Sequence, residues 1–85
     1  MAGVETVAEQ EVYRLIGDGE GRYAVVEARA GKVYSLDPQH SHEAEDTPEG
    51  MLRVVGPRGW RSREEADRLF GAMVGGERKL AETLW

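Results

Sequence analysis

The stretch Arg22–Asp37, with the sequence RYAVVEARAGKVYSLD, decides how the rest of the chain can be arranged. It holds two runs of β-branched and aromatic residues, which favour pleated strands, and between them the loop Arg29-Ala30-Gly31. A three-residue loop that ends in glycine is typical of a β-hairpin whose last loop residue is left-handed. The sequence therefore predicts a β-hairpin over residues 22–37.

The loop length also predicts which residues of the hairpin face each other. The expected pairs are Ala28–Lys32, Val26–Tyr34 and Ala24–Leu36. The more apolar face, expected to meet the core, carries Ala24, Val26, Ala28, Tyr34 and Leu36, and the other carries Tyr23, Val25, Glu27, Val33, Ser35 and Asp37. Because side chains alternate along a strand, a slip of one residue exchanges the faces.

Two structures compete for the segment before the hairpin. Apolar residues over 4–16 fall at helical spacings, which favours a helix that ends at Gly17. The alternative is a fourth strand near 12–16, joined to the hairpin through Gly17–Gly21. That strand would put Arg14 on the apolar face, and we therefore expect the helix.

The segment after the hairpin changes character. Asp37–Gly50 has five acidic residues and no lysine or arginine, which predicts a flexible, solvated acidic loop over 38–50. Met51–Val55 is then expected to form a strand, with Leu52 and Val54 on one face and Arg53 on the other.

The C-terminal third contains the clearest helix signals. Ser62 followed three residues later by Glu65 is a capping box, which predicts a helix over 62–74. Gly75-Gly76 should end it, because each glycine costs about 1 kcal/mol in a helix interior. A second short helix is expected over 77–84.

Together these elements predict a single α+β domain over residues 1–85: a small antiparallel sheet packed against the 62–74 helix. The chain has no cysteine and a net charge of −5, which argues against disulfides and against non-specific binding to nucleic acid. It shows no secretory signal and no apolar run of about 20 residues. We therefore expect a cytoplasmic protein without membrane contact.

The sequence favours a non-enzymatic protein without a cofactor. No serine or threonine stands in a recognisable arrangement with a base, and the acidic residues lie in a solvated run rather than a pocket. The leading hypothesis is a protein–protein interaction or regulatory accessory module. Its partner would be an unknown protein or a second copy of the chain.

Three sets of residues are candidates for a site. The partner-binding set is apolar and aromatic, because such residues concentrate at interfaces: Trp60, Leu80, Leu84 and Trp85. The set for an anion or single-stranded nucleic acid combines guanidinium groups with an aromatic ring beside a helix start: Arg58, Trp60, Arg61 and Arg63. A third hypothesis is a divalent metal site at His40 and His42, since imidazole is a common ligand.

Overall fold

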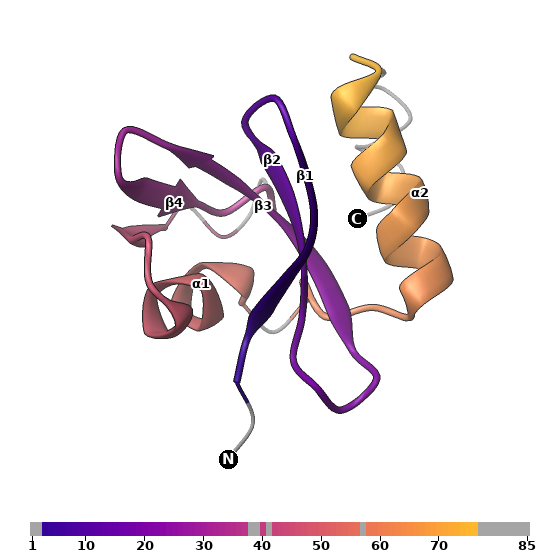
Figure 1. The fold of residues 1–85 in the computed structure, drawn as a ribbon, viewed down its shortest axis with the longest axis horizontal. Coiled ribbons are helices and arrows are strands. Elements are labelled where there is room, and N and C mark those ends of the chain that lie inside the picture. Colours follow the sequence, from indigo (N-terminus) through magenta and orange to yellow (C-terminus); the bar gives the residue numbers. More distant parts are fainter. Residues whose placement is uncertain (1–2, 38–39, 41, 57, 77–85) are drawn as a thin grey trace.

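The computed structural model describes residues 3–37, 40, 42–56 and 58–76 of the chain. In these residues five strands and two helices follow one another: β1 Glu5–Gln10, β2 Tyr13–Gly17, β3 Tyr23–Arg29, β4 Lys32–Tyr34, β5 Glu43–Glu45, α1 Pro48–Val55 and α2 Arg63–Val74. The strands form one antiparallel sheet in the order β1-β2-β3-β4-β5. Figure 1 shows α1 on one face of the sheet and α2 on the other. The predicted α+β fold class is confirmed.

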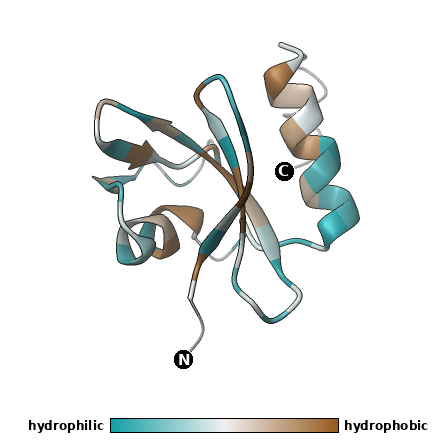
Figure 2. Cartoon of the chain, viewed as in Figure 1, coloured by the Kyte–Doolittle hydropathy of each residue, from teal (hydrophilic) through white to brown (hydrophobic). Residues whose placement is uncertain are grey.

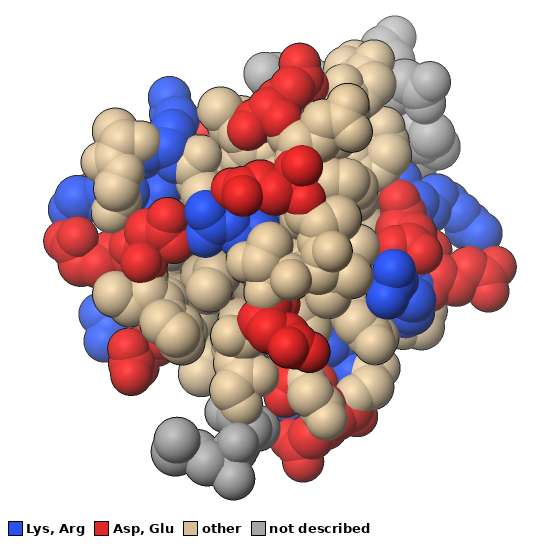
Figure 3. All heavy atoms as spheres, viewed as in Figure 1, with Lys and Arg blue, Asp and Glu red and all other residues tan. Residues whose placement is uncertain are grey.

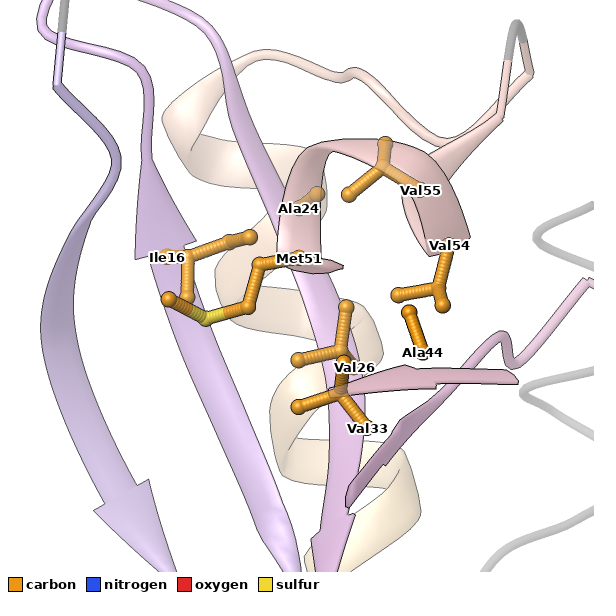
Figure 4. Close-up of a cluster of buried hydrophobic side chains, with 8 residues drawn as sticks. All are labelled: Ile16, Ala24, Val26, Val33, Ala44, Met51, Val54 and Val55. Carbon is orange, nitrogen blue, oxygen red and sulfur yellow. The ribbon is translucent and has the colours of Figure 1, made fainter. Parts of the chain in front are cut away.

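The face under α1 holds the larger core. Side chains from β2, β3, β4 and β5 meet the buried side of α1 there (Figure 4), and the cluster consists of Ile16, Ala24, Val26, Val33, Ala44, Met51, Val54 and Val55. Five of these residues are fully buried, and burial of this kind contributes about 1.5–3 kcal/mol for each large aliphatic side chain among them.

The opposite face forms a second core under α2. It is built from Leu15, Val25, Ala66, Leu69 and Ala72. In Figure 2 the first turns of α2 are hydrophilic and its later turns more hydrophobic. Because both faces of the sheet are covered, Ala24, Val25 and Val26 are all buried, and strands of this kind need not alternate apolar with polar residues.

The hairpin forms, but with a register one residue away from the predicted one. Arg29 pairs with Lys32 and Ala28 with Val33, so the loop is only Ala30-Gly31. Both loop residues have positive φ angles, 54° and 77°, and a two-residue turn of this kind matches the twist of the strands. The slip moves Val33 to the α1 face, where it is fully buried. The predicted core positions of Tyr34 and Leu36 are therefore wrong, and Leu36 instead packs on the α2 side.

The predicted helix over 4–16 is wrong: the segment forms β1 and β2, the second close to the alternative strand at 12–16. Arg14 does lie on the α1 face, opposite Val26. It is tolerated because its guanidinium reaches Glu9 at 2.9 Å and Asp46 at 2.6 Å. These two ion pairs compensate the positive charge of Arg14, which is why an arginine can lie on the apolar α1 face.

The predicted strand over Met51–Val55 is also wrong, because these residues belong to helix α1. Thr47 caps the helix by accepting a hydrogen bond from the Gly50 N–H at 3.0 Å, and Pro48 occupies the first turn, where its missing N–H costs nothing. The acidic segment is correspondingly shorter than a loop over 38–50, since β5 lies inside it and α1 begins within it.

Helix α2 agrees closely with the prediction. Ser62 is its N-cap and accepts a hydrogen bond from the Glu65 N–H at 3.2 Å, and the helix ends at Val74 before Gly75. The predicted helix over 77–84 lies outside the described residues. Among the residues that the structure does describe, neither helix has the length and apolar character needed to cross a membrane.

The N-cap of α2 leads to a first prediction. Ser62→Ala should lower the free energy of unfolding by about 1 kcal/mol, because the Glu65 N–H loses its acceptor. Urea unfolding measures this loss. Ser62→Asp keeps an acceptor at the same place and should retain most of the stability, so equal losses in the two variants would contradict the capping role.

Candidate functional site

The side chain of Arg58 forms an ion pair with Asp37. Its guanidinium donates two hydrogen bonds to Asp37, from Nε at 3.0 Å and from Nη2 at 2.8 Å. The Asp37 side chain is only 2 % exposed. The hydrogen bond to Asp37 raises the pKa of Arg58, against the effect of desolvation. This bidentate pair ties the end of the hairpin region to the connection between the helices.

Trp60 is half-buried and packs against the core under α1. The guanidinium of Arg22 lies over its ring, 5.2 Å from the centroid, and also binds Asp18 at 2.7 Å. Sequence reasoning missed Arg22 as a neighbour of Trp60. The four-residue spacing of Asp18 and Arg22 in a glycine-rich loop is the only signal that could have indicated the ion pair.

The other two arginines, Arg61 and Arg63, both contact Tyr23 but in different ways. Arg61 pairs through its backbone with Tyr23, with two N–H···O bonds of 2.8 Å, and burial lowers the pKa of its guanidinium. Arg63 enters α2, where it binds Asp67 at 3.1 Å and lies over the ring of Tyr23. Arg58, Trp60 and Arg61 therefore lie in the connection between α1 and α2, whereas Arg63 is the first residue of α2 and pairs with Asp67.

An external anion would have to displace Asp37 from Arg58 and Asp67 from Arg63. This competition weakens the case for a phosphate or nucleic-acid site, which stays a prediction. Trp60 as a partner-binding residue also stays a prediction. Leu80, Leu84 and Trp85, the rest of that set, lie outside the described residues.

The two histidines lie together but are not arranged as a recognisable metal centre. Their rings stack at a centroid distance of 5.2 Å, and Nε2 of His40 lies 3.4 Å from the carbonyl oxygen of Arg53. Within the described part of the chain, no three histidine, aspartate or glutamate side chains gather where they could hold a metal ion. The metal site at His40 and His42 stays a prediction.

The buried carboxylate of Asp18 organises the turn between β2 and β3. It accepts hydrogen bonds from the Glu20 N–H at 2.8 Å, the Arg22 N–H at 3.1 Å and the Arg22 Nε at 2.7 Å. Burial by itself would raise the pKa of Asp18, but these hydrogen bonds and the charge of Arg22 together lower it. The ionised form is therefore the one that the fold stabilises.

A pH dependence follows from this shift. Since the folded pKa of Asp18 is depressed, its contribution to stability is present above the ordinary value of 3.8 and is lost as the pH falls through the folded pKa. Asp18→Asn should therefore unfold more readily than the wild type at neutral pH, and the difference should shrink on acidification. Urea unfolding across this range tests it, with Glu20→Gln, a change at an exposed side chain, as the control. A difference that grows towards low pH would contradict the assignment.

The feature that sequence reasoning missed is the outer edge of the sheet. Strand β1 lies at one end of the strand order, and every one of its residues is exposed or half-buried. Val7 is 37 % exposed at an irregularity in the pairing with β2, and Val12 in the following turn is 36 % exposed. Figure 3 shows acidic side chains spaced along the face of the molecule that carries β1.

These observations define a small α+β domain: in the described residues α1 and α2 enclose an antiparallel sheet, and no described strand pairs with the outer side of β1. A comparison of the chain with protein-family models, curated proteins and solved structures finds no match.

Proposed function

We propose that this protein is a non-enzymatic cytoplasmic interaction module that binds another protein by strand addition at β1. The observation that carries the proposal is the position of β1: it is an outer strand of six residues, and no described residue pairs with its outer side. An edge strand directs unpaired backbone N–H and C=O groups outwards. An extended segment of a partner can bind these groups by continuing the sheet.

The opposite edge of the sheet is a poorer site for such binding. Strand β5 has only three residues, and α1 begins three residues after it and packs beside it. A short strand offers few backbone groups to a partner. This asymmetry supports β1 as the edge that a partner would use.

The side chains near β1 add apolar contact area. Val7 and Val12 are two of the three exposed large hydrophobic residues in the described part of the chain, and the third is Leu52 on α1. Val7 belongs to β1 itself, and a partner strand beside β1 would remove part of its apolar surface from water, which contributes to association.

The buried acids support a non-enzymatic role. Asp18 and Asp37 are the buried charged residues of the described part, and each is held by an arginine, Arg22 and Arg58 respectively. A buried carboxylate that stabilises a turn or a connection needs no catalytic role to explain it.

Site-specific photo-crosslinking in the cells that make the protein tests the proposal. A photoreactive amino acid at Val7 should give a discrete crosslinked product with a partner protein. The matched control places it at Leu52, which is 46 % exposed but lies on α1. Products that form equally at both positions, or at Leu52 alone, would overturn binding at β1.

A further inference from the structure

The edge of the sheet formed by β1 carries several acidic side chains. Glu5 and Glu9 belong to β1 and Glu11 to the turn that follows, and all three are exposed. Glu9 is bound to Arg14, at 2.9 Å, but its side chain remains 51 % exposed. Glu5 and Glu11 make no ion pair with any described residue. The edge therefore presents acidic side chains beside backbone groups with which no described strand pairs.

We propose that the partner segment is a basic, extended stretch of another protein, rich in lysine or arginine and in β-branched residues, and that it adds to the sheet next to β1. This inference rests on the proposed function and names the chemical class of its partner. Opposite charges on neighbouring strands stabilise their pairing, and like charges destabilise it. Glu5 pairs with Gly17 and Glu9 with Arg14, so the two acids lie on opposite faces of the sheet. A partner strand would therefore place basic residues beside them on both faces and a β-branched residue near Val7.

A second copy of the chain fits this edge poorly. Pairing β1 with β1 of another copy brings Glu5 and Glu9 of both chains onto neighbouring strands, and each chain has a net charge of −5. The irregularity at Val7 further interrupts an even ladder. Charges and bulges are the features by which natural sheets prevent pairing of identical edges. The same features leave the edge open to a strand of opposite charge.

Binding of short peptides to the full-length protein tests the inference. Three probes of about six residues, the usual length of a strand, are compared: alternating Lys-Val, alternating Thr-Val, and Lys-Val with every backbone N–H methylated. NMR titration of the ¹⁵N-labelled protein should show that Lys-Val shifts the amide signals of β1 more than those of α2. Thr-Val should bind about tenfold more weakly, since it lacks the cross-strand charge pairs. The methylated peptide should not bind.

The results separate this inference from the proposed function. Equal affinity for Lys-Val and Thr-Val would overturn the basic partner but leave strand addition at β1 in place. Equal affinity for Lys-Val and its methylated form would overturn strand addition itself, because attraction of charge would then suffice. Shifts confined to surfaces other than β1 would overturn both.

A matched pair of variants tests whether the basic peptide is attracted by the acids of the β1 edge or by the net charge of the protein. Glu5→Lys, on the open edge, should weaken binding of Lys-Val by about threefold or more. Glu20→Lys changes the net charge equally but lies in the exposed turn between β2 and β3, and it should leave the affinity unchanged. An equal loss in both variants would overturn the inference, since net charge rather than the edge would then decide the affinity. Dispersed NMR spectra of both variants show that each remains folded.

Discussion

Replacing Gly50 with alanine is expected to lower the free energy of unfolding by about 3 kcal/mol or more, which is a large share of the stability of a small domain. Gly50 is buried in the first turn of α1 and packs against the end of β5. A Cβ at this position would overlap the carbonyl oxygen of Glu45 and lie 2.9 Å from its carbonyl carbon. Because the obstacle is backbone, no change of rotamer relieves it, and α1 would have to move away from the sheet.

The matched control is Gly71→Ala in α2. Gly71 is exposed, and apart from the neighbouring backbone of its own helix a Cβ there would meet no described atom within 4 Å. Alanine in a helix interior is more favourable than glycine by about 0.5–1 kcal/mol, so this variant should be slightly more stable than the wild type. Urea unfolding midpoints of both variants test the contrast. A Gly50→Ala protein with the wild-type midpoint would contradict the close approach of α1 to β5.

The elements that sequence reasoning predicted well are those with local signals. Ser62, Glu65 and Gly75 mark the ends of α2 by short-range hydrogen bonding and backbone preference, and the structure confirms them. The hairpin was also located, but its register depended on whether Arg29 belongs to the loop. In the structure Arg29 pairs with Lys32 and so belongs to the strand, because a two-residue turn matches the twist of the two strands.

The N-terminal strands were missed because their sequence does not alternate. Both faces of the sheet are covered, so Leu15 faces α2 while the adjacent Ile16 faces α1, and both are apolar. The irregularity between Thr6 and Ala8 further interrupts the two-residue period of β1. The resulting spacing resembles that of a helix.

The open edge could not be predicted once β1 had been missed. Which strand lies outermost follows from the order β1-β2-β3-β4-β5, and this order is a property of tertiary pairing. Glu5, Glu9 and Glu11 are dispersed acids in the sequence and become one acidic edge only when β1 folds back on β2. In the arginine-rich segment, by contrast, tertiary structure pairs a charge that is unpaired in the local sequence. Asp37, 21 residues away along the chain, binds Arg58.

Helix α1 was predicted as a strand because local preference and tertiary packing oppose each other there. It has only eight residues and contains Val54 and Val55, which favour strands, and an isolated helix of this length is unstable in water. Burial against the sheet decides in favour of the helix. Met51, Val54 and Val55 follow a helical spacing and are buried, whereas Leu52 is exposed.

Two substitutions distinguish helix α1 from a strand over residues 51–55, because the two structures predict opposite orders of stability loss. In the helix, Met51→Ala should cost about 2–4 kcal/mol, because Met51 is 6 % exposed and lies within the core under α1. Leu52→Ala should cost less than about 1 kcal/mol, because Leu52 is 46 % exposed and alanine favours a helix. A strand with Leu52 and Val54 on its buried face would reverse the order of the two losses. Urea unfolding of both variants under one condition measures the order directly, and a larger loss for Leu52→Ala would show that residues 51–55 do not pack as α1.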